Sequence, residues 1–170
     1  GRKDMDIYAT MNPAKEVGGD FYDFFLIDQQ YLGIVMADVS GKGVPAALFM
    51  VIAKTLIKNR ALMGGNPAEI LEFVNNQLCE NNESEMFVTV WLGILDLSTG
   101  VMTASNAGHE YPAFRKAGGQ FELIHDDHGF VLAGMEDMPY QNYEITFSPG
   151  DSLYLYTDGV VEATNAKEEL

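Results

Sequence analysis

Three aspartates, Asp20, Asp38 and Asp158, occupy similar positions in the sequence, each at one end of an apolar, strand-like run and each close to glycine. A single Asp in such a place is typical of a turn, where the carboxylate accepts hydrogen bonds from nearby backbone amides. Three of them beside apolar strands favour another role, because carboxylate oxygens are the ligands that Mg²⁺ and Mn²⁺ prefer. The pattern therefore indicates a site for hard divalent cations.

Phosphate-loop and cyclase chemistry fit the sequence less well. The stretch SGKG at residues 40–43 is not a complete phosphate loop, because Val44 stands where that pattern needs Ser or Thr. The stretch GGDF at residues 18–21 matches the beginning of the GGDEF motif of diguanylate cyclases, but Tyr22 does not continue that motif. The order of expected strands and helices also differs from the order in those cyclases.

The sequence also gives no support for a mechanism with a serine nucleophile or for a zinc site. The sequence contains no G-x-S-x-G motif for a serine nucleophile. His109, His125 and His128 are not spaced from Cys79 as zinc ligands would be. Of the three, only His109 lies in an ordered strand-to-turn context, which favours a structural hydrogen-bonding role.

The chain has 170 residues, of which 47% are apolar, and this predicts a single domain over residues 1–170. Its net charge of −15 argues against a nucleic-acid-binding surface, because nucleic acid phosphates would be repelled. Bound cations can still invert the charge locally. No apolar run reaches the roughly 20 residues that span a bilayer. The single cysteine cannot form an internal disulfide, so we expect a cytoplasmic protein without a membrane segment.

The order of the expected elements predicts an α+β fold. A hairpin over residues 20–38 is followed by two helices and then by a series of short strands. This order is not the strand–helix alternation of a parallel sheet, so it favours an antiparallel double sheet with the helix pair on one face. The expected strands cover residues 5–12, 20–28, 31–38, 86–97, 101–108, 112–117, 120–125, 143–148 and 151–158.

The two helices are predicted from their first residues. Pro45 is well placed as the first residue of one helix, in which Lys54 and Lys58 would form a narrow polar stripe on an otherwise buried surface. Asn66 is predicted to cap the second helix together with Glu69. The apolar face of the second helix contains Ile70, Leu71, Val74 and Leu78.

Four sequence blocks together resemble the PPM-type (protein phosphatase 2C-like) serine/threonine phosphatases. They are EVGGDFYDFF, GIVMADVSGKGVPAALFM, SNAGHEYPAF and LYLYTDGVVEATN, and they occur in family order. The resemblance covers residues 5–165 and is greatest to the bacterial branch typified by stage II sporulation protein E and by phosphatases of the general stress response. It implies a β-sandwich flanked by helix pairs, the αββα arrangement of that family.

The resemblance also implies a metal site with two Mn²⁺ or Mg²⁺ ions. Asp38 matches the acid that bridges both ions, and Val39 matches the residue that contributes a backbone carbonyl to the second ion. Asp20 matches the acid on the side of the second ion, and Asp158 matches an acid that holds the first. The positions that would support the site are Gly19, Gly41, Asn106, His109 and Gly159.

The implied activity is hydrolysis of phosphoserine or phosphothreonine by a water that two ions, roughly 3.5–4 Å apart, activate for in-line attack. Asp38 and Asp20 would be the catalytic acids, and no phosphoenzyme is needed. The implied substrate is a phosphorylated regulator of the anti-anti-sigma (STAS-like) type. The chain would be the output domain of a signalling protein with an upstream sensor or receiver domain.

The sequence departs from the family pattern at its ends. The pattern continues with a final helix and a strand carrying Asp-Asp-x-Thr, whereas the only Asp pair here, Asp126-Asp127, is followed by His128. We therefore expect a domain truncated at both ends, with an incomplete first metal site. A non-catalytic, partner-binding domain of the same fold is the alternative to the enzyme. Open strand edges would also favour a homodimer.

Overall fold

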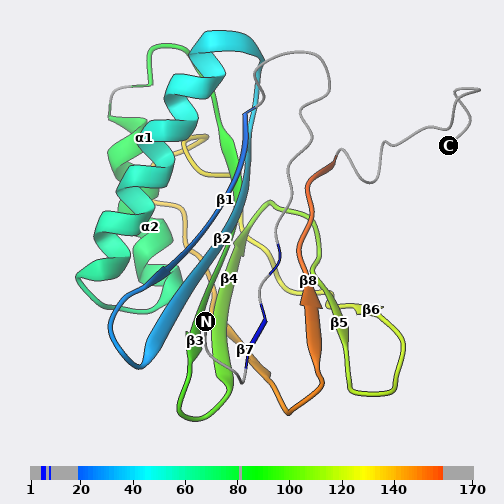
Figure 1. The fold of residues 1–170 in the computed structure, drawn as a ribbon. Coiled ribbons are helices and arrows are strands. Elements are labelled where there is room, and N and C mark those ends of the chain that lie inside the picture. Colours follow the sequence, from blue (N-terminus) through cyan, green and yellow to red (C-terminus); the bar gives the residue numbers. More distant parts are fainter. Residues whose placement is uncertain (1–4, 7, 9–18, 81, 159–170) are drawn as a thin grey trace, which may run out of the picture.

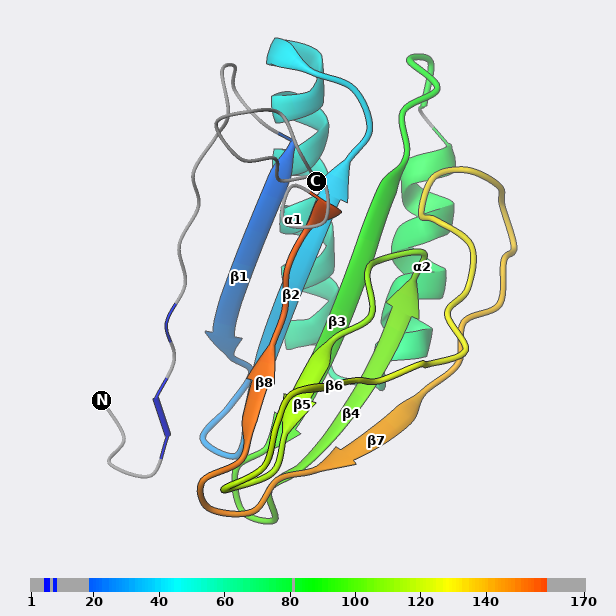
Figure 2. The same cartoon turned by 90° about the vertical axis from the view of Figure 1, so that its right-hand side faces the viewer.

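Two antiparallel sheets and one pair of helices form successive layers (Figure 1). The computed structural model describes residues 5, 6, 8, 19–80 and 82–158. The larger sheet has the strand order β1-β2-β3-β4-β7, and the smaller sheet has the order β6-β5-β8. Figure 2 shows the smaller sheet in front of the larger one, with both helices behind. The predicted α+β class, with an antiparallel double sheet and helices on one face, is confirmed.

The elements follow each other along the chain in the predicted order. They are β1 (Asp20–Leu26), β2 (Tyr31–Val39), α1 (Gly43–Leu62), α2 (Pro67–Cys79), β3 (Val88–Asp96), β4 (Val101–Ala107), β5 (Ala113–Arg115), β6 (Glu122–Leu123), β7 (Tyr143–Thr146) and β8 (Ser152–Tyr154).

Apolar side chains fill both spaces between the layers. The cluster between the helices and the larger sheet includes Ile57 of α1 and Val90 of β3, both fully buried. The cluster between the two sheets contains Trp91 and Met102, with Leu153 of β8 packed against it. Val90 and Trp91 are neighbours in β3 and enter different clusters, because successive side chains of a strand point to opposite faces. The central strands are thus covered on both sides.

The β1–β2 hairpin places two of the candidate aspartates side by side. Its antiparallel register pairs Asp20 directly with Asp38. The turn is held by Asp28, whose carboxylate accepts hydrogen bonds from the backbone N–H groups of Gln30 at 2.7 Å and Tyr31 at 2.8 Å. Because side chains alternate along a strand, the residue after Asp38 packs toward the helices while Asp38 itself faces the smaller sheet.

Helix α1 begins two residues earlier than predicted, at Gly43 rather than Pro45. Gly41 and Gly43 have φ values of +90° and +77°, a conformation that favours glycine, and they turn the chain from β2 into the helix. Pro45 lies in the first turn, where a missing N–H leaves no helical hydrogen bond unmade.

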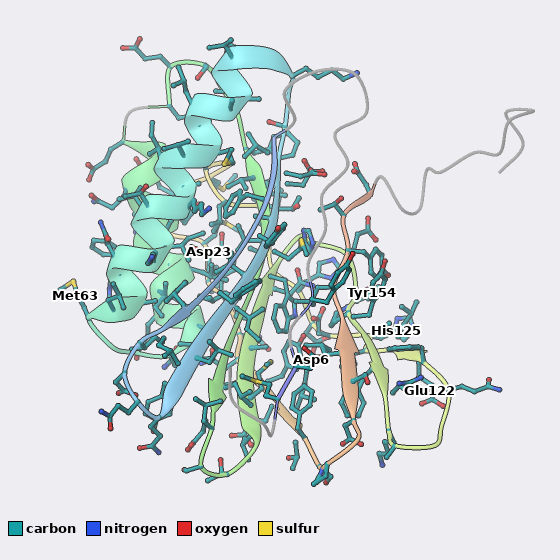
Figure 3. All side chains as sticks on the ribbon, in the orientation of Figure 1. Asp6, Asp23, Met63, Glu122, His125 and Tyr154 are labelled. Carbon is teal, nitrogen blue, oxygen red and sulfur yellow. The ribbon has the colours of Figure 1, made fainter. Side chains whose placement is uncertain are left out.

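The prediction that α1 is buried except for a stripe around Lys54 and Lys58 is wrong. The helix buries one face, which is rich in alanine and lies close to the sheet, and its opposite face is largely apolar and exposed. Figure 3 shows Met63, just after the helix, pointing away from the body of the molecule. The large exposed apolar side chains of α1 are Val44, Leu48, Val51, Ile52 and Leu62.

Helix α2 forms as predicted. The Asn66 side chain accepts a hydrogen bond from the Glu69 N–H at 3.0 Å, and the Glu69 carboxylate accepts one from the Asn66 N–H at 3.3 Å. Pro67 is the first helical residue. The predicted apolar face is buried against the larger sheet, and its residues are Ile70, Leu71, Val74 and Leu78.

Several later strands are shorter than predicted. Strands β6 and β8 pair only with the three-residue β5, so their ladders end early, and β8 stops at Tyr154 rather than reaching Asp158. The strand expected at residues 5–12 lies largely outside the described residues. Neither of the two helices in the described part of the chain is long and apolar enough to cross a membrane.

Replacing the cap residue of α2 tests how the helix layer is stabilised. Asn66→Ala should lower the free energy of unfolding by about 1 kcal/mol, because the Glu69 N–H loses its partner. Chemical denaturation followed by circular dichroism would measure this. Asn59→Ala, on the exposed face of α1, is the matched control and should cause no loss. Equal losses in both variants would contradict the capping role.

Candidate metal centre

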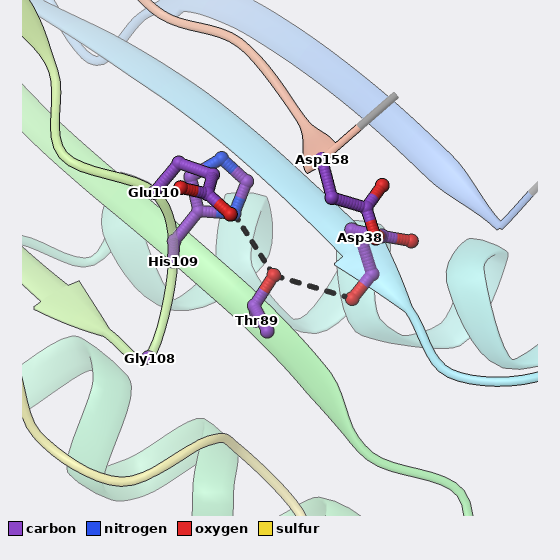
Figure 4. Close-up of a pocket in the computed structure, with 6 residues that line it drawn as sticks. All are labelled: Asp38, Thr89, Gly108, His109, Glu110 and Asp158. Atoms are coloured by element: carbon purple, nitrogen blue, oxygen red, sulfur yellow. Dashed lines mark hydrogen bonds between the residues drawn. The ribbon is translucent and has the colours of Figure 1, made fainter. Parts of the chain in front are cut away.

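Asp20, Asp38 and Asp158 meet at one end of the sandwich. Asp38 pairs with Asp20 across the hairpin, and both Asp20 and Asp158 lie close enough to raise the pKa of its carboxyl group. Figure 4 shows Asp38 and Asp158 side by side in a pocket between the two sheets. The residues that line this pocket are Asp38, Thr89, Gly108, His109, Glu110 and Asp158.

The third acid reaches the site from the smaller sheet. Asp158 lies four residues beyond the end of β8, on a segment that runs toward the β1–β2 hairpin. The Thr157 hydroxyl donates a hydrogen bond to a carboxylate oxygen of Asp20 at 2.9 Å, and this contact ties the segment to the hairpin. Acids that are 138 positions apart in the sequence (20 and 158) are thereby brought together.

Asp38 is held mainly in its protonated form. Burial raises its pKa to about 8, and the hydrogen bond and negative charge of Asp20 and then those of Asp158 add to the shift. Three neighbouring carboxyl groups cannot all carry a negative charge without strong repulsion. A proton therefore stabilises the cluster in the absence of other positive charge.

A hard divalent cation fits this set of donors. All three candidates offer carboxylate oxygens, and a bound cation would neutralise the charge that now raises the pKa of Asp38. In the described part of the chain, no three His, Cys, Asp or Glu side chains are yet arranged as a ligand set. The hairpin register and the hydrogen bond from Thr157 to Asp20 bring the carboxyl groups together, and binding an ion would require their side chains to shift.

The predicted glycines differ in their relation to the site. Gly19 lies directly against Val39: a Cβ on Gly19 would come within 2.7 Å of the Val39 carbonyl oxygen. The Val39 N–H also donates a hydrogen bond to the Gly19 carbonyl oxygen at 3.2 Å. Gly41 lies in the exposed turn before α1 and does not line the pocket. Gly159 lies outside the described residues.

His109 is buried between the two sheets. One ring nitrogen, Nε2, lies 2.8 Å from the Tyr156 carbonyl oxygen, and Nδ1 lies 2.9 Å from the Thr89 hydroxyl. A carbonyl oxygen only accepts, so Nε2 carries the hydrogen. Burial lowers the pKa of His109, which keeps the ring neutral, and Nδ1 then accepts from Thr89.

Asn106 closes the turn that carries His109. Its side-chain oxygen accepts from the His109 N–H at 2.7 Å, and its Nδ2 donates to the His109 carbonyl at 3.0 Å. Asn106 itself is buried and does not line the pocket. Its contacts are those of a residue that supports the turn.

Several residues at or behind the site were not predicted from the sequence, including Gly108 of the pocket and Thr157, which contacts Asp20. Thr89 and Glu110 line the pocket, and Asp126 contacts Asn106. Glu110 follows His109 directly, so its position could have been inferred from that neighbour. Thr89 could have been found only from the pairing of Asp38 with Thr89 across β2 and β3.

Comparison with protein families gives one match over most of the chain. The family model described as Stage II sporulation protein E (SpoIIE) matches residues 28–170. Phosphoserine phosphatase RsbU of Bacillus subtilis (strain 168) is 33% identical over 161 residues, which are 93% of this chain and 47% of that protein. Phosphoserine phosphatase RsbP of the same organism is 27% identical over 164 residues, which are 94% of this chain and 40% of that protein. The chain thus spans about half or less of these relatives.

Solved structures share the fold. The RsbU and RsbW domains of Rv1364c from Mycobacterium tuberculosis give a TM-score of 0.76 at 27% identity, over 87% of this chain and 41% of that one. The PP2C phosphatase domain of SpoIIE from Bacillus subtilis was solved with a fragment of its regulatory domain. It gives a TM-score of 0.73 at 20% identity, over 85% of this chain and 42% of that one. RsbX in complex with magnesium gives a TM-score of 0.71 at 20% identity, over 89% of this chain and 72% of that one.

The contact between Gly19 and Val39 can be tested with one added methyl group. Gly19→Ala should weaken Mn²⁺ binding about tenfold, because its Cβ would displace the Val39 carbonyl that we expect to face the ion. Isothermal titration calorimetry with MnCl₂ would measure the Kd. Gly119→Ala, in the exposed turn between β5 and β6, should leave it unchanged. Unchanged binding in Gly19→Ala would argue against a ligand role for this carbonyl.

The raised pKa of Asp38 predicts a pH dependence of the metal-free protein. Its pKa is about 8 in the folded protein against 3.8 for an ordinary aspartate, so the folded state binds one more proton between these values. Stability should therefore fall as the pH rises toward about 8 and level off above it. His109, whose pKa is lowered, contributes the opposite slope only below about pH 6.5.

The measurement is the melting temperature in EDTA between pH 6.5 and 8.5. Asp38→Asn cannot lose a proton at this position and should be more stable than the parent at pH 8, with a flatter profile. Asp127→Asn, at an exposed position, should retain the parent slope. An identical slope in Asp38→Asn and the parent would show that Asp38 is not protonated in the folded protein.

Proposed function

The chain belongs to the stage II sporulation protein E family of PP2C-like phosphatases, and on this basis we propose that it is a metal-dependent phosphoprotein phosphatase. It hydrolyses phosphoserine or phosphothreonine with the help of two Mn²⁺ or Mg²⁺ ions. The observation that carries the proposal is the convergence of Asp38 and Asp158 in one pocket, with Asp20 directly opposite Asp38 in the hairpin.

The charges around the pocket support a requirement for cations. Among the six described residues that line it, three are acidic, and the single histidine, His109, is held neutral by burial. A phosphoryl dianion would be repelled by Asp158 and Glu110 unless cations were bound first. We therefore expect substrate binding, and not only the chemical step, to depend on the metal.

The proximity of the three acids and the family pattern support an assignment of the residues that would hold the ions. Asp38 would bridge both ions, Val39 would contribute its carbonyl and Asp20 its carboxylate to one side, and Asp158 would bind on the other. When bound, the ions would supply a water of lowered pKa and positive charge for the phosphoryl oxygens. Asp38 must give up its proton for this role, so metal binding should release protons at neutral pH.

Other residues of the chain keep these acids in place. The Thr157 hydroxyl orients Asp20 through a single hydrogen bond of 2.9 Å. His109 links Thr89, which pairs with Asp38, to the segment that precedes Asp158. No side chain of the pocket needs to form a covalent intermediate with phosphate.

The similar proteins suggest the class of substrate. RsbU and RsbP are named phosphoserine phosphatases, and we extend this activity to the present chain. The proposed substrate is a phosphorylated anti-anti-sigma regulator of the STAS type, which places the reaction in the cytoplasm and in sigma-factor control. In the whole protein, an upstream sensor or receiver domain would control the activity.

Phosphatase activity should depend on Mn²⁺ and on Asp38. With p-nitrophenyl phosphate and with a serine-phosphorylated STAS protein, Asp38→Asn should reduce the rate on the order of 100-fold or more. Phosphate release at increasing MnCl₂ concentrations would measure this. Asp127→Asn removes an exposed carboxylate in the same way and should retain full activity.

Two results would contradict the proposal. One is activity of Asp38→Asn equal to that of the parent, which would remove Asp38 from the site. The other is Mn²⁺ binding without hydrolysis of either substrate, which would favour a non-catalytic domain of the same fold.

A further inference from the structure

Asp126 is a buried carboxylate that the proposed chemistry does not use. It lies between β6 and β7, and only 1% of its side chain is exposed. Its neighbour Asp127 is exposed. Burying a carboxylate is costly unless hydrogen bonds compensate for the lost water. The buried carboxylate of Asp126 therefore requires hydrogen-bond partners, and these partners show which part of the fold it stabilises.

The Asn106 amide is a neutral donor to the carboxylate. Asn106 Nδ2 lies 3.2 Å from each of the two oxygens. Burial raises the pKa of Tyr143, and the nearby Asp126 adds to this shift; the Tyr143 hydroxyl accepts a hydrogen bond from the Trp91 indole N–H at 2.8 Å. Nδ1 of the half-exposed His128 lies 3.5 Å away. Asp126 thus lies near the core between the sheets on one side and is joined to Asn106 on the other.

From Asn106 the network continues to His109. The same Nδ2 group donates to the His109 carbonyl at 3.0 Å, and the Asn106 side-chain oxygen accepts from the His109 N–H at 2.7 Å. The Asn106 carbonyl accepts from the Gly129 N–H at 2.8 Å, which also fixes the loop around Asp126. The backbone of His109 is therefore held on both sides by an amide that Asp126 orients.

The His109 ring then spans the gap between the sheets. On one side Nδ1 accepts from Thr89, which pairs directly with Asp38 in the larger sheet. On the other side Nε2 donates to Tyr156, two residues before Asp158. The ring thus acts as a spacer between the two backbone segments that carry these acids.

We propose that Asp126 is a positioning residue for the metal site. Its carboxylate orients Asn106, Asn106 holds the turn of His109, and His109 sets the separation between the segments of Asp38 and Asp158. This inference deepens the proposed function and rests on it, because it assumes that these two acids bind the ions. It concerns metal affinity and assigns Asp126 no contact with substrate.

The test is Mn²⁺ affinity, measured by isothermal titration calorimetry without substrate. Asp126→Asn keeps the shape of the side chain but places an NH₂ group against Asn106 Nδ2, so two donors would face each other. We expect the Kd for Mn²⁺ to rise about tenfold or more. Asp127→Asn is the matched control at the next position and should leave the Kd unchanged.

A second control separates positioning from general loss of stability. Asn75 is fully buried and holds the backbone of Ala133 and Met135 against α2, at 2.9 and 2.8 Å. Asn75→Ala should lower the melting temperature without changing the Kd. Thr89→Val interrupts the same network at the opposite end with a side chain of equal shape, and it should weaken Mn²⁺ binding even if Asp126→Asn folds poorly.

The outcomes distinguish this inference from the proposed function. Parent-like Mn²⁺ affinity in Asp126→Asn, or in Thr89→Val where Asp126→Asn does not fold, would overturn the positioning role. Affinity loss in Asn75→Ala as large as in Asp126→Asn would also overturn it. If the parent binds Mn²⁺ but hydrolyses no phosphoester, the phosphatase proposal fails while the positioning role stands. If the parent binds no Mn²⁺, both fail.

Discussion

Mutual repulsion among Asp20, Asp38 and Asp158 is the constraint that the rest of the structure must satisfy. Three carboxyl groups in a partly buried pocket destabilise the folded chain unless protons or cations neutralise them. Burial raises the pKa of Asp38, and the neighbouring Asp20 and Asp158 raise it further. The same arrangement that is unfavourable alone becomes a strong binding site once divalent cations are present.

The sandwich holds the acids together by fixing backbone segments. The hairpin register sets the distance between Asp20 and Asp38, and it is fixed by two apolar layers that cover β2 and β3. The distance to Asp158 depends on contacts between the sheets, where His109 and Thr157 form hydrogen bonds. Because apolar packing is not directional, these polar contacts define where the two sheets meet at the site.

Much of this fold could be predicted from local sequence patterns. The capping pair of Asn66 and Glu69 and the apolar run of β2 depend on neighbouring residues, and both were interpreted correctly. The outer face of α1 could not be predicted, because an apolar helix carries no signal for which face the sheet will cover. The early end of β8 depends on its partner β5, which is distant in sequence.

The candidate site, like the fold, could be predicted from the sequence only in part. The three aspartates are recognisable by their strand ends, whereas Asp126 looks like an ordinary loop residue until its contact with Asn106 is seen.

Whether the three aspartates form a two-ion site is tested most directly by a crystal structure of the protein grown with MnCl₂, with diffraction data measured at the manganese absorption edge. We expect two anomalous peaks within coordinating distance of Asp38, one also near Asp20 and the Val39 carbonyl and the other near Asp158. Absence of peaks at Asp38, with manganese present elsewhere or not at all, would contradict it.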